Sequence, residues 1–403
     1  MTKSKVVNFR HLANKISFHT PFVGFVHPRE KPFQLRKNIS NFVKGNKAMN
    51  RIRYILILTV FAVLTASCAG GQDASVPEPS GNGVYYWKTT FRLNDTEREF
   101  LNKNEIKRLY LRMFDVGIEE NAYPRDAQAL PIATVKFESA VPDSIEVVPT
   151  VFITLDALKS CEGKEEELAA KIVKRANAIC SYNDVGEVKE VQFDCDWTES
   201  TRGIYERLCN AARSILHQTG AQLSGTIRLH QVEEATYPFD RGVLMLYNTG
   251  AIKDPQTGNS IISYSDVAKY LGVQSRIERF NNARNGNCPI IDFAYPTFCW
   301  GVAYREDGRF DGIVKALEFD KLDWLTRESS TRYVVTEPGF YENAWYSSGT
   351  YIRPEYSDIS EILKVKDLVD KTIRSKSSSN IIYHLDGKNL SKYTDNEIEK
   401  ILR

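Results

Sequence analysis

The sequence has little that would support metal or redox chemistry. Its 403 residues include seven cysteines, but no two of them have the C-x-x-C spacing that is common in zinc and thiol redox sites. It also lacks a glycine-rich loop of the kind that holds a dinucleotide between a strand and a helix. We therefore expect neither a metal site nor a cofactor, and we interpret most of the cysteines after Cys68 as buried thiols.

Long hydrophobic runs are also rare, and the clearest one lies in residues 51–67, RIRYILILTVFAVLTAS. Two arginines precede the apolar stretch, and small residues lie directly before Cys68. Gly, Ser, Pro and polar residues follow at once, so the run does not resemble a membrane-spanning helix with a flank that stops transfer. The pattern is typical of a signal peptide that ends in a lipobox, which makes Cys68 the lipidated N-terminus of the mature chain. The alternative is a free cysteine after a transmembrane anchor.

The lipobox sets the expected boundaries of the chain. Met49 begins a signal peptide of ordinary length, so we interpret residues 1–48 as an upstream extension that belongs to no domain. The signal peptide then covers 49–67, and a flexible tether rich in Gly, Ser and Pro covers 68–83. Residues 84–403 have the length of one large barrel or of two ordinary domains. We expect a lipid-anchored protein of the cell envelope, on the outer membrane, with its face undecided.

Basic charge is scarce in the mature part. The whole chain has a formal charge of +2, but residues 68–403 contain 41 basic and 50 acidic residues, a formal charge of −9. A domain of this kind does not offer the basic surface that nucleic-acid binding requires. We therefore expect no nucleic-acid partner.

Short strand-like runs alternate with helical segments along the domain. Residues 163–180 and 200–218 are the clearest helices, because their apolar residues recur at helical spacing. Such alternation implies parallel strands joined by right-handed crossovers. Eight repeats that end in a helix at 394–402 predict an α/β fold, the (β/α)8 or TIM barrel, with an open doubly wound sheet as the alternative. The expected strands are residues 84–91, 108–117, 146–154, 190–197, 223–229, 242–248, 288–296 and 380–386.

The connection between the seventh and eighth expected strands, residues 301–378, is unusually long. It contains an aromatic-rich stretch at 332–354 and then a helical segment at 358–374. An insertion of this size can form a small subdomain over the barrel mouth, where the active sites of this fold lie.

An ionisable cluster is expected at the carboxyl ends of the fourth and fifth strands. Alternation places Gln192, Asp194 and Asp196 on one face of the fourth strand, directed into the barrel. Arg228 and His230 share a face of the fifth strand. Buried charges are costly unless they are paired or used, so the cluster is a candidate functional site, and the alternative is a network that only closes the core. We expect the carboxyl groups beside Arg228 to have lowered pKa values and to stay ionised.

Carboxylates that stay ionised are poor general acids, so a proton donor would have to come from elsewhere. Glu199, Glu337 and His230 are the candidates, and each is also compatible with a plain surface or loop position. Regular alternation sends Glu199 away from Asp196, so it can act as an acid only if a bulge at the strand end turns it inward.

Three segments resemble strands of the family-18 glycoside hydrolases, the chitinase-like barrels. They are FDCDW at 193–197, LMLYN at 244–248 and YHLD at 383–386. That family carries Asp-x-Asp-x-Glu on strand four, Met-x-Tyr-Asp on strand six and a Trp near the end of strand eight. The stretch QFDCDWTESTRGIY also resembles uncharacterised bacterial lipoprotein barrel domains. The resemblance implies a (β/α)8 barrel that acts on a glycan or binds one.

The resemblance also implies roles for single residues. In the family, the glutamate protonates the leaving oxygen, the substrate's acetamido group attacks the anomeric carbon, and the preceding aspartate orients that group. Asp194 and Asp196 match the two aspartates, and Tyr247 matches the tyrosine that holds the acetamido group. Thr198 stands in place of the glutamate, which leaves Glu199 as the candidate acid.

Two further positions depart from the family pattern. Asn248 replaces the aspartate of strand six, and Tyr383 replaces the tryptophan of strand eight. Binding survives such changes better than hydrolysis does, because aromatic faces can cover the apolar side of a sugar while polar groups bind its hydroxyls. The expected binding residues are Trp197, Arg228, His230, Asn248, Trp300 and Tyr383, and the aromatics Tyr341, Trp345, Tyr346 and Tyr351 of the insertion are either further platforms or a small core of their own.

Two hypotheses therefore remain open. The first is a glycan-degrading enzyme of the cell envelope, with Asp194 and Asp196 as charge stabilisers and Glu199 or Glu337 as the acid. The second is a non-catalytic glycan-binding or scaffold lipoprotein in which the acidic cluster is structural. The expected partners in both are a glycan and, through the lipid, a membrane.

Overall fold

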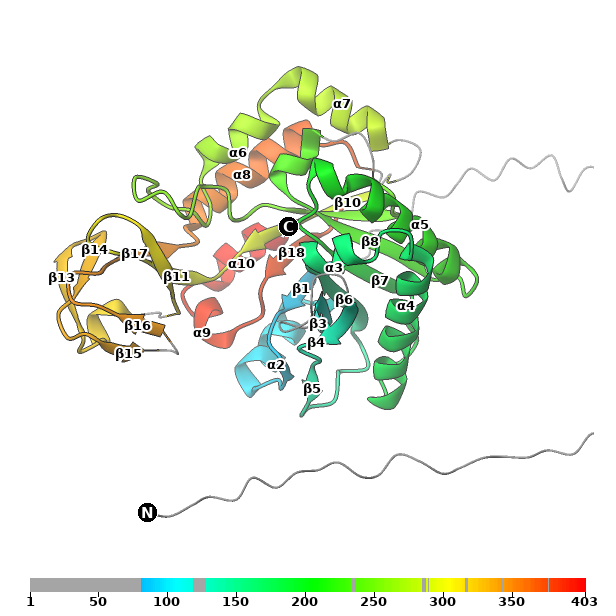
Figure 1. Ribbon diagram of the computed structural model, residues 1–403, viewed down its shortest axis with the longest axis horizontal. Coiled ribbons are helices and arrows are strands. Elements are labelled where there is room, and N and C mark those ends of the chain that lie inside the picture. The colour runs from blue at the N-terminus through cyan, green and yellow to red at the C-terminus, as the bar shows by residue number, and fades with distance from the viewer. Residues whose placement is uncertain are drawn as a thin grey trace, which may run out of the picture. The chain divides into compact units, whose positions relative to one another are not determined.

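A closed ring of eight parallel strands forms the centre of the folded part of the chain (Figure 1). Each strand pairs with the next one in chain order, and the first strand pairs with both the second and the last, which closes the ring. The predicted (β/α)8 barrel is thus confirmed, and the open sheet is excluded. The strands are β1 (Gly83–Tyr86), β3 (Arg108–Ile118), β6 (Glu146–Ile153), β7 (Glu190–Asp194), β8 (Gln222–Ile227), β9 (Arg241–Met245), β10 (Ile290–Pro296) and β18 (Asn380–Tyr383).

The computed structural model describes residues 81–403, apart from 119–127, 234–236, 285–287, 289, 316–317, 342–343 and 376. The predicted upstream extension, the signal peptide and Cys68 lie outside the described residues. Within the described residues, no helix combines the length and the hydrophobicity that a membrane span requires. The same residues contain no cluster of three or more His, Cys, Asp or Glu side chains placed to hold a metal ion.

Helices cover the outside of the ring (Figure 1). α4 and α5 form where Leu168, Ile172 and Leu208 belong to apolar stripes at helical spacing, and these stripes are buried. Asn94 and Thr394 begin two other helices with capping boxes, which satisfy the first free backbone N–H groups. The helices are α2 (Asp95–Lys103), α3 (Leu155–Ser160), α4 (Glu165–Tyr182), α5 (Arg202–His217), α6 (Tyr264–Leu271), α7 (Gln274–Arg284), α8 (Ile359–Thr372), α9 (Gly387–Leu390) and α10 (Asp395–Leu402).

Alternate residues of β7 line three layers inside the barrel. Glu190 lies at the amino end, where it is ion-paired with Arg108. Gln192 lies in the middle and accepts a hydrogen bond of 2.7 Å from the Tyr85 hydroxyl. Asp194 lies at the carboxyl end. The interior is therefore filled by paired polar side chains, as the cost of burying unpaired ones requires.

A separate antiparallel sheet follows β10. It consists of β11 (Cys299–Tyr304), β12 (Phe310–Val314), β13 (Leu325–Ser329), β14 (Arg332–Val335) and β17 (Tyr351–Tyr356). A hairpin of β15 (Gly339–Tyr341) and β16 (Ala344–Tyr346) lies beside it in Figure 1. This sheet has a hydrophobic cluster of its own, which includes Phe319, Trp324 and Val335. The predicted insertion 301–378 also takes in α8, but the buried Ile362 and Val365 of that helix belong to the barrel core.

Candidate functional site

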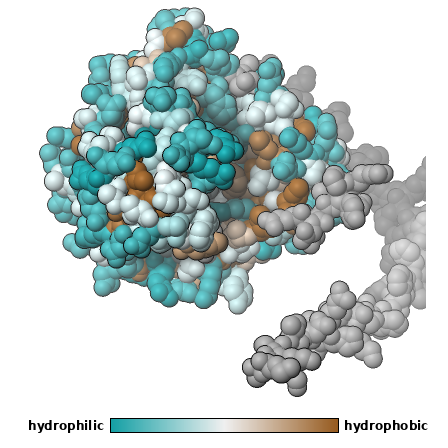
Figure 2. Space-filling model, turned by 60° about the vertical axis from the view of Figure 1, so that its left-hand side comes forward, coloured by the Kyte–Doolittle hydropathy of each residue, from teal (hydrophilic) through white to brown (hydrophobic). Residues whose placement is uncertain are grey.

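A cleft of about 1400 Å³ opens at the carboxyl ends of the barrel strands, beside the inserted sheet. The barrel contributes residues that directly follow its strands or end them: Trp87 follows β1, Tyr247 follows β9, Phe298 follows β10 and Tyr383 ends β18. The inserted sheet adds Trp300 of β11 and Val314 of β12, and the hairpin adds Phe340 and Tyr341 of β15. Figure 2 views the molecule from the side of the insertion and shows hydrophobic side chains gathered where the mostly hydrophilic surface is hollowed.

Aromatic rings form a continuous row along this cleft. The Tyr383 ring stacks on Tyr247 with 4.4 Å between ring centroids, and it lies 5.9 Å from both Trp87 and Phe298. Phe298 in turn lies 5.0 Å from Trp300. Trp87, Trp300 and Tyr383 are partly exposed. The row therefore presents apolar faces to the cleft, each fixed by its neighbours.

The indole of Trp300 is held in a defined orientation. Its Nε1 donates a hydrogen bond of 2.8 Å to Glu355, a carboxylate that is 1% exposed. Glu355 also accepts hydrogen bonds from Ser260 and Arg353. Trp300 is therefore positioned by a buried polar network, and its partly exposed ring lines the cleft.

The predicted charged cluster lies behind the aromatic row. Asp194 accepts hydrogen bonds from the Thr226 hydroxyl at 2.6 Å and from Arg228 Nη2 at 2.9 Å. Arg228 Nε donates to Asp196 at 2.5 Å, and its Nη1 lies 3.4 Å from the Tyr247 hydroxyl. The structure thus brings Asp194, Asp196, Arg228 and Tyr247 together, with the guanidinium at the centre.

The expectation of a lowered pKa is wrong for Asp194. Burial raises the pKa of this carboxyl, and the lowering effects of Arg228 and Thr226 do not offset it. The side chain of Asp194 is only 4% exposed, so the loss of hydration outweighs a single cation. Burial also raises the pKa of the Tyr247 hydroxyl, against the lowering effect of Arg228.

Two predicted residues are placed differently because β7 ends at Asp194, three residues earlier than expected. The side chain of Asp196 is 53% exposed and reaches the cluster only through Arg228. Trp197 is 3% exposed and stacks on Tyr205 of α5, so its ring faces are not available to a sugar. The prediction of Trp197 as a sugar platform is therefore wrong.

None of the three candidate proton donors lines the cleft. Glu199 is exposed in the short helix η1 (Glu199–Thr201), where a capping box between Thr198 and Thr201 turns the chain out of the strand. His230 is exposed in η2 (Leu229–Glu233), because β8 ends before it and alternation no longer applies. Glu337 is exposed in the connection before β15. The structure thus places Glu199, Glu337 and His230 outside the cleft, in the surface or loop positions that were the alternative for each.

The remaining predicted residues divide between the cleft and the insertion. Asn248, with a φ of +54°, lines the cleft beside Tyr247. Tyr341 also lines it and stacks on Trp324 at 4.0 Å. Tyr346 is 2% exposed and belongs to the hydrophobic cluster of the inserted sheet, and Tyr351 stacks on Tyr304 at 5.3 Å. Trp345 is 57% exposed and does not line the cleft.

Two carboxylates line the cleft among the described residues, and each is paired with a lysine. Asp386 accepts a hydrogen bond from the Asn389 backbone and lies 3.1 Å from Lys88. Burial acts to raise the pKa of Asp386, but these contacts outweigh it and lower the pKa. Glu318 is exposed and lies 2.8 Å from Lys321. Both carboxylates that the described part of the cleft presents are thus ion-paired with a lysine.

Sequence reasoning missed Trp87, Lys88, Phe298 and His384, all of which line the cleft. Their common signal is position, because each lies within two residues of the carboxyl end of a barrel strand. His384 is half-buried, its Nδ1 has no hydrogen-bond partner among the described atoms, and burial lowers its pKa. The basic residues at 388–392 follow the last strand and were not singled out.

Comparisons with protein-family models and with curated proteins found no match. Among solved structures, a chitinase from Chromobacterium violaceum is similar with 10% identity and a TM-score of 0.47, over 80% of this chain and 98% of that one. The Ostrinia furnacalis Group IV chitinase in complex with allosamidin is similar with 10% identity and a TM-score of 0.47, over 80% of this chain and 97% of that one. The Bacillus cereus spore cortex-lytic enzyme SleL is similar with 12% identity and a TM-score of 0.46, over 81% of this chain and 75% of that one. These similarities concern the fold alone.

Proposed function

We propose that this chain is a lipid-anchored glycan-binding protein of the cell envelope, whose barrel mouth holds a sugar chain without cleaving it. The single observation that carries the proposal is the row of rings that runs from Trp87 through Tyr383 and Tyr247 to Phe298 and Trp300 along an open cleft. Neighbouring sugars present alternating apolar faces and hydroxyl edges, so a sugar chain matches a row of rings bordered by polar groups.

Several features favour binding over hydrolysis. Thr198 occupies the sequence position of the family's acid, and it caps η1 instead of facing the cleft. The two carboxylates in the cleft are engaged by Lys88 and Lys321. A glycosidase requires an acid beside the leaving oxygen, and no described residue of the cleft supplies one.

One observation favours turnover as a second candidate. Asp194 has a raised pKa and lies in the cluster that contacts Tyr247 through Arg228. Its carboxyl is buried, accepts a hydrogen bond from Thr226 and does not line the cleft. An acid role for Asp194 therefore requires a rearranged cleft.

The lipid anchor is inferred from the sequence that precedes Cys68. Processing there leaves a tether rich in Gly, Ser and Pro between the lipid and the barrel. A flexible tether of this kind lets the cleft search the space above the membrane. The anchor and the binding cleft together suit a protein that retains a glycan at the cell envelope.

A glycan panel tests the proposal with the mature chain carrying Cys68→Ser, which removes the lipid site. We expect one or more oligosaccharides to bind and to be recovered intact by mass spectrometry after prolonged incubation. Release of shortened products would replace binding with hydrolysis, and Asp194→Asn would then show whether Asp194 is the acid. Absence of binding across the panel would overturn the proposal.

A further inference from the structure

The cleft is rich in positive charge. Among the described residues that line it, six carry basic side chains and two carry acidic ones. This balance is the reverse of that of residues 68–403 as a whole, whose formal charge is −9. A positively charged cleft on a negatively charged domain attracts negatively charged ligands. The basic residues are Lys88, Arg112, Lys315, Lys321, Lys388 and Lys392, and the acidic ones are Glu318 and Asp386.

Several basic side chains of the cleft take part in ion pairs within the protein. Lys88 lies 2.8 Å from Glu97 and 3.1 Å from Asp386, and Lys321 lies 2.8 Å from Glu318. Arg112 is ion-paired with Asp115. Both carboxylates of the cleft are therefore engaged by these two lysines. An anionic ligand consequently meets little repulsion from the cleft.

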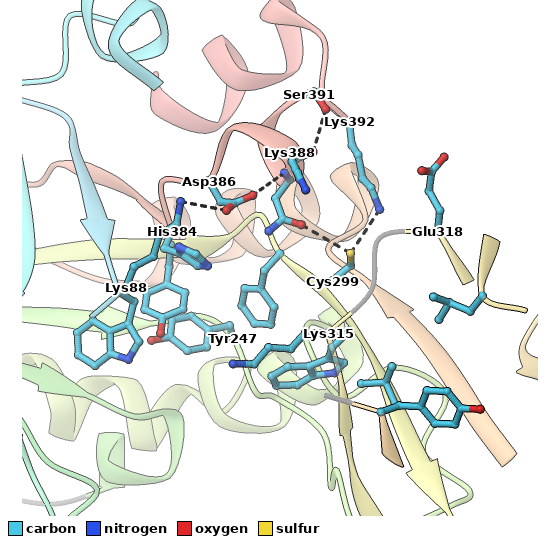
Figure 3. Close-up of a pocket in the computed structure, with 18 of the residues that line it drawn as sticks. Lys88, Tyr247, Cys299, Lys315, Glu318, His384, Asp386, Lys388, Ser391 and Lys392 are labelled. Carbon is cyan, nitrogen blue, oxygen red and sulfur yellow. Dashed lines mark hydrogen bonds and ion pairs between the residues drawn. The ribbon is translucent and has the colours of Figure 1, made fainter. Parts of the chain in front are cut away.

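The exposed positive charge is placed around the aromatic row. Lys315, Lys388 and Lys392 are exposed and line the cleft. Figure 3 shows Lys388 and Lys392 on one side of Cys299 and Lys315 on the other. The ammonium group of Lys392 lies 3.3 Å from the Cys299 sulfur, which anchors it at the cleft wall. A ligand that stacks on the rings thus has Lys388 of α9 and Lys392 on one side, and Lys315, which follows β12, on the other.

We propose that the cleft selects an acidic glycan, one whose sugars carry carboxylate or sulfate groups. This inference rests on the proposed glycan binding and names the class of sugar. The rings take the apolar sugar faces, and Lys315, Lys388 and Lys392 take the anionic substituents. Exposed lysines of this kind act as solvated point charges, so each adds a modest and salt-sensitive part of the affinity.

The direct test compares matched ligands on the mature chain with Cys68→Ser. One ligand is an oligomer of uronic acids, the second is the same oligomer with its carboxylates reduced to alcohols, and the third is a sulfated oligosaccharide of similar length. Calorimetry at low and high salt gives each dissociation constant. We expect an acidic oligomer to bind about tenfold more tightly than the reduced one at low salt, with the difference shrinking as salt is added. Which acidic oligomer binds identifies the anionic group.

Charge-neutralising variants locate the effect. Lys388→Gln and Lys315→Gln should each weaken binding of the acidic oligomer about threefold, and should thereby narrow the difference in affinity between the acidic and the reduced oligomer. Lys174→Gln is the matched control, because Lys174 is an exposed lysine of α4 outside the cleft. An equal loss in the control variant would mean that only the net charge of the protein matters, which contradicts the proposal.

The remaining outcomes are distinct. Equal binding of the acidic and reduced oligomers would overturn the acidic-glycan inference and leave the proposed glycan binding intact. Equal binding of polyglutamate, which has carboxylates but no sugar rings, would overturn the inference and count against the proposed function as well. Binding of none of the three oligosaccharides, together with a negative glycan panel, would overturn both.

Discussion

Asp194 and Arg228 form an ion pair at the carboxyl end of the barrel interior, next to the cleft. The carboxyl is almost fully buried, and among the described residues its charged hydrogen-bond donor is the guanidinium of Arg228 at 2.9 Å. Such a pair contributes little net stability, since both ions lose hydration, but the loss of one partner leaves the other buried and uncompensated. The pair also holds Arg228 against the Tyr247 ring, so it links the barrel interior to the cleft.

We predict that Arg228→Met lowers the free energy of unfolding by about 3 kcal/mol at neutral pH, because it leaves the Asp194 carboxylate without a cation. A second change, Asp194→Asn, should recover most of that loss, since it removes the stranded charge. Urea denaturation of the wild type, both single variants and the double variant measures the coupling. Losses that simply add would show that the two side chains do not interact.

The raised pKa of Asp194 makes a prediction about pH. A carboxyl whose pKa is higher in the folded state than its ordinary value of 3.8 stabilises the fold when protonated, and that contribution is lost as pH rises through the raised pKa. Asp194→Asn mimics the protonated form at every pH. The stability of the wild type relative to this variant should therefore fall as pH rises above 3.8 and then level off. A relative stability that increases over this range would contradict the raised pKa.

At the scale of elements, the repeat of strands and helices was predictable and the strand ends were not. Alternation on β7 correctly directs Gln192 and Asp194 into the barrel, because both lie within the strand. The same rule fails for Trp197 and His230, since a period of two holds only while the chain remains extended. The capping contacts of η1 end the extended stretch that begins with β7. Such contacts depend on the conformation of the turn, which the strand pattern does not give.

The cleft itself was less predictable than the barrel. One wall comes from an inserted sheet whose pairing joins residues far apart in the chain, such as Trp300 opposite Glu355. No local pattern gives that register. Residue type indicates Trp300 as a candidate platform and the family resemblance indicates Tyr383, whereas Trp87 and Phe298 require the positions of the strand ends.

The inserted sheet should be able to loosen without opening the barrel, since it has a hydrophobic cluster of its own. Trp324 is 9% exposed and packs between Tyr341 and Tyr346. We predict that Trp324→Ala costs about 3 kcal/mol of local stability, because it leaves a cavity among these rings. Hydrogen exchange should then accelerate in β13 and β14 and stay slow in β7. Equal acceleration in β7 would show that the sheet and the barrel unfold as one unit.

At the scale of the whole molecule, we propose that a lipid on Cys68 anchors the barrel whose mouth carries the cleft. Cys68→Ser should abolish lipid labelling and move the protein out of the membrane fraction, because it removes the thiol to which the lipid would be attached. Fractionation of cells that express either form measures this. Retention of the variant in the membrane fraction would contradict the lipid anchor.

The central claim is that the aromatic row binds a glycan and leaves it intact. The most direct measurement is calorimetric titration of the best oligosaccharide from the panel into the wild type, Trp300→Ala and Trp345→Ala, with the sugar recovered for mass spectrometry. Trp345 is a matched control, since it is 57% exposed and lies outside the cleft. Trp300→Ala should weaken binding by about 1 to 3 kcal/mol, because a stacking face is lost. Trp345→Ala should bind like the wild type. The recovered sugar should be intact in every case. Unchanged affinity in Trp300→Ala, or a cleaved sugar, would contradict the account.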